Sequence, residues 1–268
     1  MARRAKSALK KQEYGILVPP RYAVYFIPKS GSILAALGSS LLGRDSETGL
    51  PVRQPELPGV SRERLAELTE NARHYGLHAT LKAPFYLKAG ISEADLLEAA
   101  RRFSIRKTSI TLPRLVLARL GSFFALTPGA KTPQEIRELA PLNELAAETV
   151  VFFDDLRAEP DAREMRRRRP GSLTPRQRGF LMDWGYPYVF EEYRFHITLT
   201  DHISDSGEAE ALQKALTAYL RPLLHEPAVM TAIAICKAEK SARAESPRSE
   251  EDFFTLCAFG MGNCAEYG

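Results

Sequence analysis

Two short segments of the chain carry residue types that could perform chemistry. Residues 77–81 read Leu-His-Ala-Thr-Leu and residues 195–199 read Phe-His-Ile-Thr-Leu, so one pattern occurs twice, almost half the chain apart. Histidine titrates near neutral pH and can take or give a proton, and a threonine hydroxyl can donate a hydrogen bond to an anionic oxygen. Two such pairs in one site would suit acid–base catalysis on a phosphate ester.

The alternation of polar and apolar residues predicts that both segments are β-strands with two different faces. The polar face is expected to carry His78, Thr80 and Lys82 in the first strand and Arg194, His196, Thr198 and Thr200 in the second. A single His-x-Thr is usually structural. A duplicated unit with pseudo-twofold symmetry, however, would place the two strands side by side with their polar faces at one cleft.

The sequence contains no Gly-x-Ser-x-Gly, no phosphate-cradling glycine-rich loop and no lysine-based nucleotidyltransferase signature. A zinc site is an alternative, because His74 and His78 have a spacing that suits zinc on a helix. Gly76 lies between them, however, the alternation puts His78 on a strand, and no third ligand is near in sequence. We therefore expect no metal and no cofactor.

Several cations and aromatic residues flank the two motifs. Lys82 and Arg194 could form structural ion pairs or, on a concave face, could contact a phosphate. The run 166–169 consists of four arginines, and a solvated helix end is favoured there over a phosphate-gripping role. Residues 184–188 read Trp-Gly-Tyr-Pro-Tyr, which is either a packing loop or a cleft wall that stacks on a sugar or base.

The bulk composition is that of an ordinary globular protein, with 44% hydrophobic and 26% charged residues in a chain of 268. A net charge of +4 fits an anionic ligand without requiring nucleic acid. Three cysteines are an odd number, which favours a reducing compartment. No apolar run reaches membrane-spanning length, and no apolar signal core follows the basic N-terminus. These features predict a cytoplasmic protein without membrane contact, and we expect it to be a monomer.

Around each motif the sequence predicts the same order of strand, helix and hairpin. The expected strands besides the motifs are 21–28, 110–117, 122–127, 228–237 and 252–260, and the expected helices are 33–42, 61–74, 92–103, 132–149, 174–183 and 206–224. Residues 1–18 are expected to be a basic tail, 19–260 a bilobal domain and 261–268 a loose tail. Within the domain, the lobes are predicted at 19–150 and 185–260, with a helical insert at 151–184.

The chain resembles the 2H phosphoesterases, a family named for paired His-x-Thr/Ser motifs, and most closely the branch found beside phosphonate-degradation genes. The resemblance spans about residues 20 to 260, and it is carried by Arg21–Phe26, His78–Phe85, Leu173–Gln177, Trp184–Tyr188 and Arg194–Thr200. It implies an α+β fold with two topologically similar lobes in pseudo-twofold relation. Each lobe would carry a small, mostly antiparallel sheet with outer helices, and the two sheets would form a central cleft.

The resemblance implies metal-independent opening of a cyclic phosphodiester, with one histidine as acid and the other as base. The residues expected to catalyse are His78, His196, Thr80 and Thr198, and those expected to bind substrate are Lys82, Arg194, Tyr25, Trp184 and Tyr188. The substrate would be a ribose cyclic phosphate from carbon–phosphorus bond cleavage, or a 2′,3′-cyclic nucleotide or RNA end. The alternative is a non-catalytic RNA- or nucleotide-binding accessory protein, and the basic segments could contact RNA in either case. The sequence does not assign the acid and the base.

Overall fold

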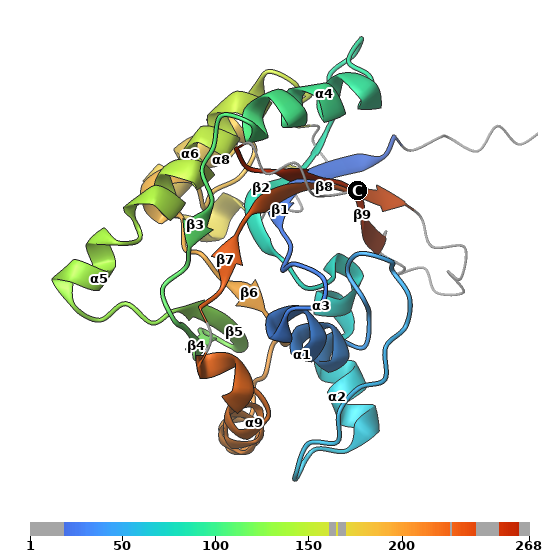
Figure 1. Cartoon of the computed structure of the whole chain (residues 1–268), viewed down its shortest axis with the longest axis vertical. Coiled ribbons are helices and arrows are strands. Elements are labelled where there is room, and N and C mark those ends of the chain that lie inside the picture. Colours follow the sequence, from blue (N-terminus) through green and yellow to red (C-terminus); the bar gives the residue numbers. More distant parts are fainter. Residues whose placement is uncertain (1–18, 161–164, 166–169, 226, 240–251, 263–268) are drawn as a thin grey trace, which may run out of the picture.

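The main sheet of the protein is antiparallel and seven-stranded, with the strand order β4-β5-β6-β2-β1-β8-β9 (Figure 1). The computed structural model describes residues 19–160, 165, 170–225, 227–239 and 252–262. The strands are β1 Arg21–Phe26, β2 Ala79–Tyr86, β4 Leu115–Leu120, β5 Phe123–Pro128, β6 Ile197–Thr198, β8 Ala232–Glu239 and β9 Asp252–Gly260. A separate two-stranded sheet pairs β3 Ile110–Thr111 with β7 Val229–Met230. The mixed α+β class with an antiparallel sheet is thus confirmed.

Several helices begin at, or one residue after, the position predicted from the sequence. The helices are α1 Ile33–Leu42, α2 Arg62–Leu68, α3 Glu70–Tyr75, α4 Glu93–Ser104, α5 Pro133–Arg137, α6 Ala140–Asp154, α8 Pro175–Trp184 and α9 Ser206–Tyr219, with short 3₁₀ turns η1 Pro170–Ser172, η2 Phe190–Glu192 and η3 Arg221–His225. Ser92 and Thr174 form complete capping boxes, in which side chain and backbone satisfy each other's hydrogen bonds. In Figure 1, α4, α6 and α8 lie in the upper part of the molecule, and α1, α2, α3 and α9 in the lower part.

The main hydrophobic core lies between one face of the sheet and the helices. It contains the apolar residues of both motifs, including Leu77, Ala79, Phe195, Ile197 and Leu199, all of which are buried. Burying one such large side chain stabilises the fold by about 1.5–3 kcal/mol. The prediction that one face of each motif is core is therefore confirmed, and the opposite face is left for the polar residues.

The two halves of the sheet exchange their hairpins. The β4–β5 hairpin, which follows the first motif in sequence, pairs with β6 of the second motif. The β8–β9 hairpin, which follows the second motif, pairs through β8 with β1, the neighbour of β2. The predicted order of strand, helix and hairpin is present after each motif. The two expected sheets, however, are joined edge to edge through β2 and β6, and each half combines strands from both predicted lobes.

Two predicted helices are each divided in the structure. The helix expected over 61–74 breaks at Thr69 into α2 and α3, and the helix expected over 132–149 becomes α5 and α6. Pro141 at the start of α6 explains the second break, because proline lacks the N–H and collides with the preceding turn.

The tail 1–18, the run 166–169 and residues 263–268 lie outside the described part of the chain. Among the described residues, no helix is both long and apolar enough to span a membrane.

Candidate active site

The two His-x-Thr motifs meet at the junction of β2 and β6. Ala79 pairs with Ile197 in antiparallel register, so His78 is next to Thr198 and Thr80 is next to His196. Residues directly opposite each other in an antiparallel pair point to the same face. The four polar side chains therefore lie together on the face opposite the main core, and each histidine immediately precedes the first residue of its strand.

Both imidazole rings are oriented by the same kind of hydrogen bond. Nδ1 of His78 lies 2.9 Å from the carbonyl oxygen of Gly76, and Nδ1 of His196 lies 2.7 Å from that of Arg194. A carbonyl oxygen can only accept a hydrogen bond, so each Nδ1 carries a proton. In the neutral ring, Nε2 is then the nitrogen with the free lone pair, and it is the atom available for proton transfer.

His78 lies against aromatic rings. Tyr25 stacks on its imidazole with a centroid distance of 3.9 Å and an interplanar angle of 26°, and the ring of Tyr75 is 6.1 Å away. Burial lowers the pKa of His78 to about 4; the hydrogen bond to Gly76 opposes this shift, and the nearby His196 adds to it. His78 is thus neutral at pH 7. Tyr25, predicted as a substrate contact, is placed at the site as the platform for this ring.

The surroundings of His196 differ from those of His78. In the second motif, Thr198 pairs with Ala125 of the neighbouring strand β5. In the first motif, Thr80 pairs with Tyr25 of the neighbouring strand β1. An alanine therefore occupies the position that corresponds to the tyrosine platform. The nearest described ring to His196 is that of Phe123, at 6.1 Å between centroids and tilted by 51°. The two halves repeat the histidine and threonine but not the aromatic partner.

Lys82 does not share the face of His78, so that expectation is wrong. Thr80 pairs with Tyr25 and Lys82 pairs with Val24, with a register shift between the two pairs. Because Val24 and Tyr25 are consecutive, they point to opposite faces, and so do Thr80 and Lys82. Lys82 is buried, and its ammonium group donates to the Val150 carbonyl at 2.9 Å and to the Asp154 carboxylate at 3.0 Å.

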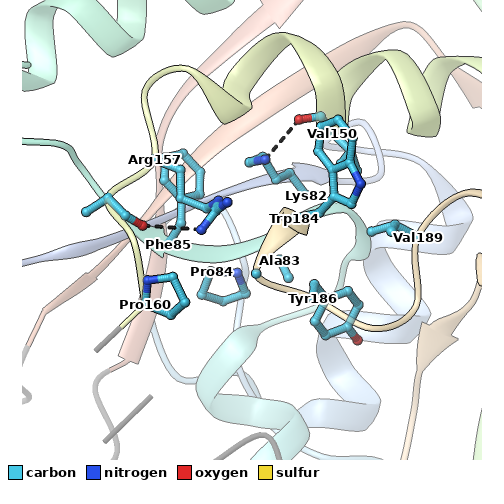
Figure 2. Close-up of a pocket in the computed structure, with 12 residues that line it drawn as sticks. Lys82, Ala83, Pro84, Phe85, Val150, Arg157, Pro160, Trp184, Tyr186 and Val189 are labelled. Carbon is cyan, nitrogen blue, oxygen red and sulfur yellow. Dashed lines mark hydrogen bonds between the residues drawn. The ribbon is translucent and has the colours of Figure 1, made fainter. Parts of the chain in front are cut away.

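The network around Lys82 connects β2 to α6 and to the loop after α8. Arg157 donates through Nε to Asp154 at 2.8 Å and through Nη2 to the Asp183 carbonyl at 3.0 Å. Although burial alone would raise it, the hydrogen bonds from Arg157 and Lys82 hold the pKa of Asp154 below its usual range. Figure 2 shows Lys82, Arg157 and Trp184 around a cavity of about 10 Å³, room for about one water molecule. This cavity is too small for a substrate.

The aromatic segment 184–188 borders that cavity, and Trp184 and Tyr186 both line it. Trp184 lines the cavity and packs edge-on against Phe190, which has a φ of 52°, unusual for a residue other than glycine. Tyr188 is 45% exposed and packs against Tyr186. Burial raises the pKa of Tyr25, and Tyr186 is close enough to contribute to that shift. The expected contacts of Trp184 and Tyr188 with substrate stay predictions.

Arg194 lies outside the strand on which it was expected. β6 contains only Ile197 and Thr198, so the alternation predicted from 194 onward does not determine where this side chain points. Arg194 is exposed, and its Nη1 donates to the carbonyls of Glu191 and Tyr193. Its expected contact with substrate stays a prediction, as do the catalytic roles of the four motif residues.

Two further residues at the site were missed. The carbonyl of Gly76 orients His78, and its φ of 71° together with a close approach to Ser46 leaves no room for a side chain. Tyr75 stacks on Phe253 beside the Tyr25 platform.

His74, considered above as a zinc ligand, has its Nδ1 2.5 Å from the Asp252 carboxylate. Within the described residues, no group of three or more His, Cys, Asp or Glu side chains is placed to hold a metal ion.

The fold and the site together define an α+β protein with two histidine–threonine pairs on one face of a shared antiparallel sheet. The chain belongs to the family described as "Protein of unknown function (DUF1045)", whose model matches residues 80–244. It is 36% identical over 261 residues to a protein of Janthinobacterium sp. (strain Marseille) named ribose 1,5-bisphosphate phosphokinase PhnN. That match covers 90% of this chain and 56% of the relative.

A protein of the same name from Laribacter hongkongensis (strain HLHK9) is 35% identical over 208 residues, covering 77% of this chain and 46% of the relative. The chain thus spans about half the length of these curated relatives. Among solved structures, LigT of E. coli complexed with 3′-AMP is 13% identical and matches with a TM-score of 0.37 over 91% of this chain and 99% of that one. A structure described as a phosphoesterase has 13% identity, the same coverage and a TM-score of 0.36.

Proposed function

We propose that the protein opens a cyclic phosphodiester by acid–base catalysis between His78 and His196, without a metal ion. The observation that supports this most directly is the β2–β6 register, which brings the two motifs together on one face. Each Nδ1 is held by a carbonyl, so both rings have Nε2 available for proton transfer. Such a pair suits phosphodiester hydrolysis, because water must lose a proton while the departing oxygen gains one.

The different surroundings of the two histidines support an assignment of roles. His78 is neutral at pH 7, since burial lowers its pKa to about 4, and we assign it as the base. Its Nε2 takes a proton from water while the water oxygen forms a bond to phosphorus. The ring P–O bond breaks, and protonated His196 donates its proton to the departing oxygen. The product is a phosphomonoester with a free neighbouring hydroxyl, and solvent returns the proton from His78 to His196.

Thr80 and Thr198 are assigned to the non-bridging oxygens of the phosphate. Both are half-buried, and each lies directly opposite the histidine of the other motif. Their hydroxyls can donate hydrogen bonds to oxygens that become more negative as water attacks. Each threonine lies on a strand that pairs with a neighbour on both sides, which limits the movement of its backbone. Removing one such donor typically costs about a hundred- to a thousandfold in rate.

The names of the relatives support a ribose phosphate as the substrate. The activity in their name is phosphorylation of ribose 1,5-bisphosphate. This chain, which covers about half of each relative, contains no glycine-rich phosphate-binding loop. We therefore assign the kinase activity to the part of the relatives that this chain does not cover. Opening a cyclic phosphate on a ribose that carries a second phosphate would leave a ribose bisphosphate. The protein would supply that product, in phosphonate degradation, to a kinase of the named type.

The proposal is tested by incubating the protein with a panel of cyclic phosphates, in EDTA, and following products by ³¹P NMR. The panel contains a ribose 1,2-cyclic phosphate with and without a 5-phosphate, 2′,3′-cyclic nucleotides and an RNA with a 2′,3′-cyclic end. We expect conversion to a phosphomonoester, fastest for the ribose phosphate. Tight binding without conversion would instead identify a nucleotide- or RNA-binding accessory protein. Activity that EDTA abolishes and one divalent ion restores would contradict the metal-independent mechanism.

A further inference from the structure

The direct pairing between the two catalytic motifs is very short. β6 has two residues, and β2 and β6 share a single residue pair, Ala79 and Ile197. By comparison, β1 and β8 pair over five residues. A single residue pair constrains the distance between His78 and His196 only weakly, because the hydrogen bonds at the ends of strands open easily. Other contacts must therefore fix the two histidines relative to each other.

Asp201, shortly after the second motif, makes a four-point contact with the helices before the first motif. Its backbone N–H donates to the carbonyl of Leu68 at 2.6 Å. Its carboxylate accepts from the backbone N–H of Asn71 at 2.8 Å, from the Asn71 side-chain amide at 3.0 Å and from the backbone N–H of Ala72 at 3.1 Å. These hydrogen bonds are made at the point where the predicted long helix is divided into α2 and α3.

Helix α3 depends on Asp201 because its own N-cap residue does not cap it. Thr69 makes no side-chain capping bond to α3; its hydroxyl instead donates back to the Leu65 carbonyl at 2.8 Å. The carboxylate of Asp201 satisfies free N–H groups of the first turn, and its negative charge suits the positive end of a helix. α3 ends at Tyr75, directly before Gly76, whose carbonyl orients His78.

The other side of Asp201 is fixed to the sheet that carries His196. The Thr200 hydroxyl accepts a hydrogen bond from the backbone N–H of Phe124 at 2.9 Å, and the backbone N–H of Leu199 donates to the Phe124 carbonyl at 2.9 Å. A continuous set of side-chain and backbone hydrogen bonds thus runs from β5 and the segment after β6 through Asp201 to α3, which leads to His78.

We propose that Asp201 is a positioning residue, which holds the His78 motif in register with the His196 motif by capping α3 from the other half of the chain. The inference rests on the proposed two-histidine chemistry. In this inference, Asp201 contacts neither the substrate nor an imidazole ring, but it determines where the two histidines lie relative to each other. Effective proton transfer needs donor and acceptor within hydrogen-bond reach, so a displacement of about 1 Å is costly.

The test compares Asp201→Ala, Asp201→Asn and Asp201→Glu with the matched control Asp205→Ala. Asp205 also caps a helix, α9, through a bond from the Glu208 N–H at 2.6 Å, but α9 does not lead to either histidine. Two quantities are measured: kcat and KM on the best cyclic phosphate, and the titration midpoint of His78 from its imidazole NMR signals, assigned with His78→Gln. The groups facing His78 are Tyr25, Tyr75 and His196, and they are unchanged in every variant.

We expect Asp201→Ala and Asp201→Glu to lower kcat by about ten- to a hundredfold with little change in KM. Both should raise the His78 midpoint from about 4 toward its ordinary value, because a displaced α3 lets water reach the ring. Asp201→Asn keeps an acceptor oxygen in place and should restore most of kcat, and Asp205→Ala should leave kcat and midpoint unchanged. If Asp201→Glu matched the parent, or if Asp201→Ala matched Asp205→Ala, Asp201 would be an ordinary cap. The NMR midpoint decides this even if the parent hydrolyses no phosphodiester, a result that would overturn the proposed function alone.

Discussion

The two histidines of the site have the same hydrogen bond and different neighbours. Each donates from Nδ1 to the carbonyl two residues earlier, so the backbone alone sets the tautomer. Among the described residues, His78 has a stacked ring, Tyr25, and His196 has none; Ala125 occupies the corresponding place beside Thr198. At the scale of single residues, the duplicated motif therefore gives two imidazoles with the same orientation, and the aromatic platform gives them different surroundings.

Replacing either His78 or His196 by alanine should lower kcat/KM by at least about a hundredfold, because each acid or base contributes about a hundred- to ten-thousandfold. The fold should survive, because both rings lie on the face opposite the main core. Steady-state kinetics and circular dichroism check both parts. His202→Ala, at an exposed position two residues beyond Thr200, is the control. A single-histidine variant that kept near-full activity would contradict the paired mechanism.

The pH profile of kcat/KM should be bell-shaped, with its acid limb near pH 4. In the free protein burial lowers the pKa of His78 to about 4, so the base stays unprotonated down to that pH and activity falls as it gains a proton. The alkaline limb belongs to loss of the acid's proton, and the two limbs describe the coupled pair. The profile is measured at constant ionic strength.

Changing Tyr25 to alanine should move that acid limb to higher pH, because water would reach the His78 ring and its pKa would rise. Tyr25→Phe keeps a stacked ring and should leave the limb in place, which makes it the matched control. An acid limb that did not move in Tyr25→Ala would mean that the platform does not set the protonation of His78. Folding of both variants is checked by thermal unfolding.

At the scale of elements, the contact between β2, α6 and the 184–188 loop depends on one carboxylate. Asp154 accepts from Lys82 and Arg157, and Arg157 in turn holds the Asp183 carbonyl at the end of α8. Asp154→Asn should leave Lys82 buried without its counter-charge, and breaking such a pair costs about 3–5 kcal/mol when fully buried, less here because Asp154 is partly exposed. The melting temperature should fall accordingly.

The same variant has a spectroscopic readout, because Trp184 is the single tryptophan of the chain and lines this cavity. Its emission should shift to the red in Asp154→Asn as the loop loosens and water enters. Asp155→Asn, at the exposed neighbouring position, should leave emission and stability unchanged. Identical spectra for the two variants would show that the loop is anchored by other contacts.

Elements whose signals are local were predictable from the sequence. Helices α4 and α8 begin beside Ser92 and Thr174, because a cap acts within one turn. The break at Thr69 was not predictable, since Asp201 arrives from the far half of the chain. Likewise, the irregular register of β2 reverses the face of Lys82, and no short-range pattern encodes such a bulge. The His and Thr residues of both motifs were singled out by their repetition, but Gly76 and Tyr75, which contact His78, were not.

At the scale of the whole molecule, the exchanged hairpins make the two halves of the sequence interdependent. We expect fragments 19–150 and 151–268, prepared separately, to unfold without cooperativity, because β6 lacks both neighbours in one fragment and β1 lacks β8 in the other. Mixing the fragments during refolding should restore a cooperative transition. The measurement is thermal unfolding by circular dichroism, together with the dispersion of amide NMR signals. A cooperative transition for fragment 19–150 alone would show that the predicted lobes are independent domains.

The hairpin exchange also determines when the strand pairs of the main sheet can form during synthesis on the ribosome. β1 and β2 are made early, but β1 forms its second set of strand pairs only with β8, which ends at Glu239. Until then the growing chain exposes an unpaired strand edge beside the tyrosine on which His78 stacks, and such an edge readily pairs with another chain. Slow translation between β1 and β8 would prolong that exposure. Silent codon changes in this stretch, which alter no residue, should therefore change the soluble yield of the protein.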